Sequence, residues 1–227
     1  MMTMVAIHTT YDDLAILIPD DARTLAGFRE WARSDSYPDW GRICFIGQEI
    51  YVDMSPEKIE AHAKIKAEIA RVIGTLVKEA NRGEFYPDRC LFTNEEAQLS
   101  TEPDSSFASW PTIELKRLQF VGGGEDAVEL AGTLDWVLEV VSDSSVVKDT
   151  EVLRKAYHRA GVGEYWLVDG RKDLSFNVLV REKDGFIEAE SREGWRYSTT
   201  FGRWFHLDRR RGRLGRWEYL LAHTESV

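Results

Sequence analysis

The sequence predicts an α/β fold in which a mixed central sheet is flanked by helices. Three observations lead to this class: an early pair of β-rich runs, two segments with helical apolar spacing, and two apolar strands on either side of a later predicted helix, Thr150–Ala160. The chain has 227 residues, of which 43% are hydrophobic, enough for one well-buried core. We therefore expect residues 1–227 to form a single domain.

The first elements are a short helix and a hairpin. Apolar residues recur at helical spacing over Thr24–Arg33, which predicts the helix. Two β-rich runs follow, Arg42–Ile46 and Glu49–Asp53, and Gly47-Gln48 between them suits a tight turn. The two runs are expected to pair as antiparallel strands.

The clearest helix of the chain is predicted to begin at Ser55. Ser55 can cap it, Pro56 suits its first position, and Glu57 lies favourably at the positive end of the helix dipole. The segment Asn81–Gly83 ends it. Five apolar residues fall on one face, which is expected to be core: Ile65, Ile69, Val72, Ile73 and Leu76.

The second half of the chain predicts a strand, a helix, a strand and a hairpin. Leu91–Leu99 before them is a weaker strand candidate, and Gly122–Gly124 is a loop without the Lys-Ser/Thr pair of a phosphate-binding loop. The predicted elements are the mostly buried strand Leu134–Val141, the helix Thr150–Ala160 capped by Gly161, the strand Gly163–Asp169, and the hairpin of Phe176–Val180 and Phe186–Glu190.

The charge of the chain is uneven. Its net charge of −10 argues against a protein whose whole surface binds nucleic acid. Between Arg203 and Arg216, however, six arginines accompany one acid. This run is either a solvated turn or a phosphate-backbone contact through Arg209, Arg210, Arg211 and Arg213. Three nearby tryptophans are expected to pack a small C-terminal sheet, with base stacking as the alternative: Trp195, Trp204 and Trp217.

Composition argues against several other classes of protein. No apolar run approaches the roughly 18–20 residues needed to cross a bilayer. The opening segment Met1–Thr10 lacks the basic region and long apolar segment of a signal peptide, so we expect a cytoplasmic protein without membrane contact. Cys44 and Cys90 cannot by themselves form a disulfide framework or a four-ligand zinc site.

Glu139 is the most informative position for chemistry. A carboxylate inside an apolar run is costly to bury without a partner, so Glu139 faces either a structural Arg or Lys, or a site that uses its charge. Asp104, which follows Pro103, is a second candidate. With a nearby lysine, the two carboxylates would form a Mg²⁺ site that leaves positions for waters and a phosphate oxygen.

Six short motifs follow one another in an order that resembles a known family. They are Val52–Glu57 with His62, Pro103-Asp104, Leu138–Ser142, Lys148-Asp149, Tyr157–Val162 and Glu164–Asp169. Together they resemble the Uma2 family of bacterial proteins, which are described as restriction endonucleases. The resemblance covers roughly Ile43–Phe205 and implies a restriction-endonuclease-like PD-(D/E)XK core, with a short N-terminal extension and a C-terminal segment rich in Arg and Trp.

By this resemblance, Asp104 and Glu139 would be catalytic metal ligands, and the backbone carbonyl of Val140 would be a further ligand. Three other residues could support the site: Glu60, His62 and Tyr157. Each also has a structural interpretation: ordinary charge placement at a helix start for Glu60, a hydrogen-bonded group for His62, and packing for Tyr157.

The catalytic lysine departs from the family's pattern. Val141 stands two residues after the glutamate, and Leu153 stands four residues before the tyrosine, where lysines are usual in this fold. Lys148, just before the predicted helix, is the first candidate for the missing ammonium group, and Lys155 within the helix is the second.

The resemblance implies a Mg²⁺- or Mn²⁺-dependent endonuclease in which a metal-bound water hydrolyses a phosphodiester bond of DNA. A homodimer would supply two sites for two strands. Because both usual lysine positions are lost, a catalytically inactive binding protein on the nuclease scaffold is the alternative. A glycoside hydrolase built on the two carboxylates is a third interpretation.

Overall fold

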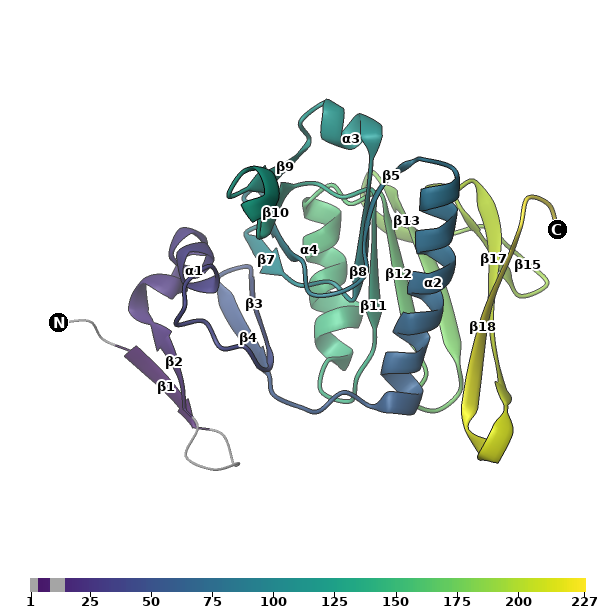
Figure 1. The fold of residues 1–227 in the computed structure, drawn as a ribbon, viewed down its shortest axis with the longest axis horizontal. Helices are drawn as coiled ribbons and strands as arrows, with labels where there is room; N and C mark the ends of the chain where they lie inside the picture. Colours follow the sequence, from purple (N-terminus) through teal and green to yellow (C-terminus); the bar gives the residue numbers. More distant parts are fainter. Residues whose placement is uncertain (1–3, 9–14) are drawn as a thin grey trace.

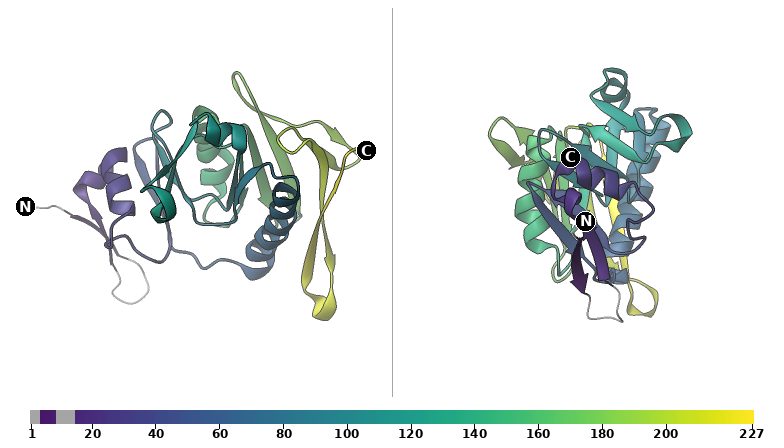
Figure 2. Two further views of the ribbon diagram at one scale, coloured as in Figure 1. Left: turned by 45° about the horizontal axis from the view of Figure 1, so that its top comes forward. Right: turned by 90° about the vertical axis from the view of Figure 1, so that its left-hand side faces the viewer.

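The computed structural model describes residues 4–8 and 15–227 (Figure 1). The opening segment Met1–Thr10, considered above as a signal peptide, falls partly outside the described residues. Two main helices, α2 (Lys64–Glu79) and α4 (Leu153–Arg159), lie on opposite sides of a six-stranded sheet (Figures 1 and 2). The predicted α/β class with helices on both faces of a mixed sheet is confirmed.

The sheet between the helices carries the residues of the candidate site. Its two central strands, β11 (Trp136–Val140) and β12 (Glu164–Asp169), run parallel to each other. Every other pair of neighbouring strands in this sheet is antiparallel, so the sheet is mixed. In spatial order its strands are β14 (Gly185–Glu188), β13 (Ser175–Glu182), β12 (Glu164–Asp169), β11 (Trp136–Val140), β8 (Ser105–Ser109) and β5 (Gly83–Tyr86).

A second six-stranded sheet packs beside α4 and includes the predicted N-terminal hairpin. In spatial order its strands are β4 (Glu49–Asp53), β3 (Arg42–Ile46), β7 (Leu99–Thr101), β6 (Leu91–Asn94), β10 (Glu129–Gly132) and β9 (Leu118–Val121). The helical elements nearby are η1 (Asp20–Arg23), α1 (Leu25–Ala32), α3 (Trp110–Glu114) and η3 (Gly124–Asp126). The expected hairpin is therefore confirmed as part of a larger sheet.

Two small sheets lie at the ends of the molecule. The first consists of β1 (Met4–His8) and β2 (Ala15–Pro19). The C-terminal sheet consists of β15 (Ser191–Arg192), β16 (Trp195–Ser198), β17 (Arg203–Arg211) and β18 (Trp217–Thr224), with the turn η5 (Arg213–Gly215). The three tryptophans near the C-terminus lie on β16, β17 and β18, as expected. The long β17–β18 hairpin runs along α2 (Figure 1).

Strand β11 separates two halves of the core, because successive side chains of a strand point to opposite faces. Trp136, Leu138 and Val140 pack with α2 and the C-terminal sheet. Val137 and Val141 pack with α4 and the second sheet. Glu139 shares the parity of Val137 and Val141, and it therefore faces α4.

The structure corrects two predicted elements. The long helix does not begin at Ser55: a π-helical turn, η2 (Ile59–Ala63), leads into α2. Ser55 instead donates its backbone N–H and its hydroxyl to Asp53, so its hydrogen bonds stabilise a turn and not a helix cap. The weak strand Leu91–Leu99 is two strands, β6 and β7, joined by a turn.

Among the described helices, none combines the length and apolar character needed to span a bilayer.

The C-terminal sheet is tied to the core through one buried carboxylate. Glu164 on β12 is inaccessible to solvent, and its oxygens accept hydrogen bonds from four groups: Trp166 Nε1, the hydroxyls of Ser198 and Thr199, and the Thr200 amide. An amide side chain offers only one accepting oxygen for these donors.

We therefore expect Glu164→Gln to lower the free energy of unfolding by about 1–3 kcal/mol, because buried donors lose their acceptor. Urea denaturation measures the change, and Glu188→Gln, at an exposed position on β14, is the matched control. Equal stability of the two variants would contradict a structural role for Glu164.

Candidate active site

Asp104 is fixed directly opposite Glu139 by the backbone of β11. The Asp104 amide donates to the carbonyl of Leu138 at 3.0 Å, and its Oδ2 accepts from the amide of Val140 at 2.7 Å. Glu139 is the residue between these two anchors. The Pro-Asp step that precedes β8 thus brings together two carboxylates that are 35 positions apart in the chain.

Glu139 is almost wholly buried, and its Oε1 accepts a hydrogen bond from the hydroxyl of Tyr157 on α4 at 2.5 Å. Burial, against the opposing charge of Lys148 and together with the carboxylates of Asp104 and Asp149, raises the pKa of Glu139 to about 8. Within the described residues, the second oxygen, Oε2, accepts no hydrogen bond. This oxygen is therefore available to a ligand.

The positive charge of Lys148 lowers the pKa of Glu139 and so opposes the effect of burial. Lys148 lies in the π-helical turn η4 (Lys148–Val152), and its Nζ is 3.1 Å from Asp149 Oδ1. Burial lowers the pKa of Lys148, but the charges of Glu139 and Asp149 outweigh burial and hold this pKa above its usual value. Lys148 is therefore a protonated ammonium at neutral pH.

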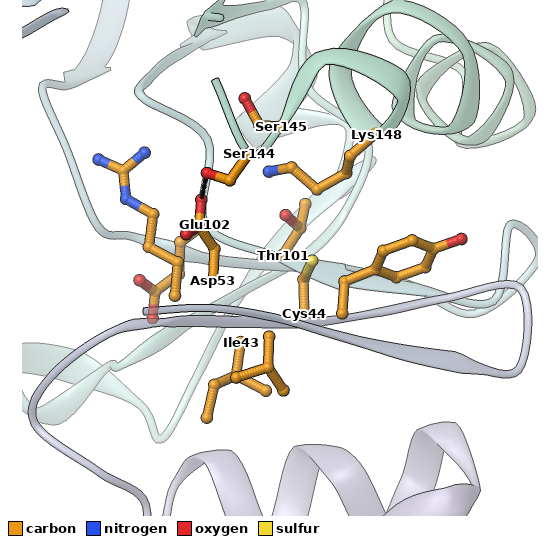
Figure 3. Close-up of a pocket in the computed structure, with 11 residues that line it drawn as sticks. Ile43, Cys44, Asp53, Thr101, Glu102, Ser144, Ser145 and Lys148 are labelled. Carbon is orange, nitrogen blue, oxygen red and sulfur yellow. Dashed lines mark hydrogen bonds between the residues drawn. The ribbon is translucent and has the colours of Figure 1, made fainter. Parts of the chain in front are cut away.

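A small cavity of about 80 Å³ opens beside Lys148 (Figure 3). It lies between the β3–β4 hairpin and the loop that follows β11, where Ser144 donates to Asp53 at 2.6 Å. Figure 3 shows Lys148 extending above Cys44 and Thr101 toward Ser144 and Ser145. The hairpin thus forms one wall of this cavity, whose lining includes Lys148 and Arg42 but neither Asp104 nor Glu139.

Three cationic or imidazole groups surround Asp104. Arg42 Nη1 donates to Asp104 Oδ1 at 2.9 Å, and Lys66 Nζ lies 3.6 Å from the same oxygen. His62 Nε2 lies 3.5 Å from Oδ2, and its Nδ1 pairs with Glu57. The buried Asp104 carboxylate therefore lies in a surrounding rich in positive charge.

The structure brings together five of the residues predicted from the sequence: Asp104, Glu139, Lys148, His62 and Tyr157. It places two others elsewhere. Lys155 is exposed on α4 and lines a separate hollow with His158 and Arg159. Glu60 binds the C-terminal hairpin, and the acid that supports His62 is Glu57.

Two residues of the site were missed from the sequence, Arg42 and Lys66. Lys66 carried a signal, because it follows His62 by four residues and precedes Ile69 by three, which places it on the buried side of the helix. Arg42 opens a β-rich run and had no local feature that set it apart from other arginines. Its role depends on which strand the hairpin packs against.

The predicted arginines lie around the turn of the β17–β18 hairpin. Arg209 donates to the carbonyls of Gly170 and Lys172, and Arg210 pairs with Glu218 at 3.1 Å. Arg211 and Arg213 are exposed near the turn. The run is therefore a structured hairpin end, in which Arg209 is held by the core and the others face solvent.

Comparison with known proteins was made on sequence and on structure. The profile of the Uma2 family, described as "Putative restriction endonuclease", matches residues 25–208. The chain belongs to the Uma2 family. A similar solved structure is described as a putative nuclease belonging to DUF820 from Anabaena variabilis; it shares 22% identity, covers 78% of this chain and 90% of its own, and superposes with a TM-score of 0.58. No curated protein matches the chain.

The donor set of this Uma2 protein fits a hard divalent cation. In the described part of the chain no cluster of three or more His, Cys, Asp or Glu side chains forms a metal site. Mg²⁺ is commonly held by only one or two carboxylates together with waters and substrate oxygens. Glu139 Oε2 is free of hydrogen bonds within the described residues, and the Asp104 carboxylate has lone pairs beyond those that accept from Arg42 and Val140.

The raised pKa of Glu139 predicts how stability depends on pH. Between pH 5 and 8 the folded chain holds a proton on Glu139 that the unfolded chain, with a pKa near 4.5, has lost. Raising the pH over this range therefore favours unfolding. We expect the free energy of unfolding to fall less steeply from pH 5 to 8 in Glu139→Gln than in the wild type, as measured by urea denaturation at each pH.

Glu151→Gln, at an exposed position of η4, is the control and should follow the wild-type profile. Parallel profiles for the wild type and Glu139→Gln would contradict a buried, protonated Glu139.

Proposed function

We propose that this protein is a divalent-metal-dependent endonuclease that hydrolyses phosphodiester bonds of DNA. One observation carries the proposal: Asp104, just before β8, lies opposite Glu139 on β11, and the positive charge of Lys148 acts on Glu139. Membership of a family described as restriction endonucleases supports the same chemistry. Membership of this family gives no support to the interpretation of the protein as a glycoside hydrolase.

Asp104 and Glu139 would hold Mg²⁺ or Mn²⁺, with the backbone carbonyl of Val140 as a third oxygen ligand. When bound, such a cation activates a water and offsets the charge that develops on the phosphate oxygens. Glu139 would have to lose its proton for this role, because only the ionised carboxylate is a good ligand. Tyr157 would orient Glu139 through its hydrogen bond to Oε1.

Lys148 would contribute a positively charged hydrogen-bond donor and would not act as a general base. Its pKa lies above the usual value, so it keeps its proton at neutral pH and can donate hydrogen bonds to a phosphate oxygen or to the attacking water. It would replace the lysine expected at Leu153, whose side chain is buried in the apolar core. The site would thus keep an ammonium group that originates five residues earlier in the chain.

DNA would contact the hairpin end through Arg210, Arg211 and Arg213, which face solvent on an otherwise acidic protein. Arg209, held by two backbone carbonyls, would support this surface. Because each chain supplies one site, cleavage of both strands would use two copies.

A second candidate function is a binding protein that has lost catalysis. Both usual lysine positions are apolar, and the Asp104 carboxylate is engaged by Arg42 and the Val140 amide. In such a protein, the contacts of Asp104 with Arg42 and the Val140 amide would take the place of a bound metal ion. Calorimetry separates the two functions, since only the enzyme needs carboxylate-dependent binding of Mg²⁺ or Mn²⁺.

Asp104→Asn and Glu139→Gln should each reduce Mg²⁺-dependent cleavage of plasmid DNA to background, a loss of about 10³-fold or more, because each removes a charged oxygen ligand. Both should also abolish the heat of Mn²⁺ binding. Asp126→Asn, at an exposed position in η3, is the control and should cleave like the wild type. Full activity in the Glu139 variant would rule out this assignment.

The two lysines predicted from the sequence can be distinguished directly. Lys148→Met should lower kcat by about 10²-fold or more, because the buried ammonium is lost. Lys155→Met should change kcat by less than about twofold, since Lys155 is exposed on a separate surface. The reverse order of effects, in a plasmid-cleavage assay, would show that Lys155 is the residue used.

A further inference from the structure

The turn of the β17–β18 hairpin presents an apolar side chain to solvent. Leu214 is 91% exposed, the highest value among the large exposed hydrophobic side chains of the described residues. Its φ of 60° lies in the left-handed region, which is uncommon for leucine. Glycine would adopt this backbone conformation at lower cost.

The backbone of the turn is closed by its own hydrogen bonds. The amide of Gly212 donates to the Arg216 carbonyl at 2.8 Å, and the Gly215 amide donates to the Gly212 carbonyl at 3.2 Å. Behind the turn, the guanidinium groups of Arg209 and Arg211 lie over the ring of Trp217, at 4.4 and 3.6 Å from its centre. Leu214 is therefore held at the end of an ordered arm.

The arm is also fixed relative to the candidate active site. Glu60 Oε2 accepts from the amide of Trp217 at 2.7 Å, and Lys64 Nζ donates to the Trp217 carbonyl at 2.8 Å. Glu60 shares the turn η2 with His62, which lies beside Asp104. Figure 1 shows the turn of the hairpin beyond the end of α2 at which η2 begins, so the arm extends from the same end of the molecule as the site.

The charge around Leu214 suits a polyanion. Residues 209–216 contain five arginines and no acid, in a chain whose net charge is −10. Arg213 and Arg216, on either side of Leu214, are both exposed, and Arg216 Nη1 lies 3.4 Å from Glu60 Oε1. Arginines beside an apolar tip are the combination with which proteins enter the DNA minor groove, where the apolar group separates two stacked base pairs and kinks the duplex.

We infer that the β17–β18 arm binds the minor groove of duplex DNA and that Leu214 enters a base step as a wedge. Arg213 and Arg216 would contact the phosphates on the two sides of the groove. The bend would bring the duplex around the end of α2 toward Asp104 and Glu139. This inference rests on DNA as the proposed substrate, and it assigns to the arm a role separate from cleavage.

The test is the bending of a 30-base-pair duplex labelled with fluorophores at both ends, without divalent cation so that the DNA stays intact. Wild-type protein should raise energy transfer, as expected for a bend between about 20° and 90°. Leu214→Ala should remove the bend and weaken binding about tenfold, while Leu214→Met should retain both. Leu220→Ala, at an exposed leucine on the same hairpin away from the turn, is the matched control and should behave like the wild type.

Three results would overturn the inference: a bend that is unchanged in Leu214→Ala, no binding to the duplex, or a loss of self-association or vesicle binding in Leu214→Ala without any effect on DNA. The cleavage reaction is tested independently. Bending that depends on Leu214 in a protein that never cleaves DNA would disprove the proposed function and leave the arm's role intact. Cleavage of DNA without bending that depends on Leu214 would disprove the role of the arm and leave the proposed function intact.

Discussion

The contact between Asp104 and β11 is the constraint on which the candidate site depends. One residue donates to the Leu138 carbonyl and accepts from the Val140 amide, so its carboxylate is fixed opposite Glu139. Since side chains alternate along a strand, a shift of β11 by one residue would turn Glu139 toward α2 and separate the two acids. The two hydrogen bonds between Asp104 and β11 therefore fix the register between the strands, and the same register places Glu139 opposite Asp104.

Around this contact the protein balances several buried charges. Burial and neighbouring carboxylates raise the pKa of Glu139 and of Asp149, and the positive charges of Lys148, Arg42 and Lys66 lie around these acids on three different elements. Buried charges are tolerated only when they are paired or hydrogen-bonded. The position of a single lysine in the chain is then less important than the presence of an ammonium group near the acids, which is the reason for proposing Lys148 in place of a lysine at Leu153.

The C-terminal sheet links this site to the outer surface of the molecule. Glu164 holds the sheet to β12, and Glu60 holds its long hairpin to the start of α2. Glu60, which sequence reasoning assigned to support of the acids, thus connects the arm to the site. Because the sheet is held in this way, a chain with a net charge of −10 can present the arginines of residues 209–216 together at the turn of the β17–β18 hairpin.

The sequence by itself determined the class of the fold, the hairpin at Arg42–Asp53, the buried strand with Glu139 and the membership of a nuclease-like family. These features are local: apolar periodicity, turn residues and short motifs are set by neighbours in the chain. The start of α2 was missed because Ser55 has a nearer partner in Asp53 than a helix amide. Only the tertiary structure decided that Arg42 and Lys66 face Asp104, that the charge of Lys148 acts on Glu139, and that Lys155 lies on a separate exposed surface. The reason is physical: the energy of a charge depends on the groups around it, and folding brings those groups from distant parts of the chain.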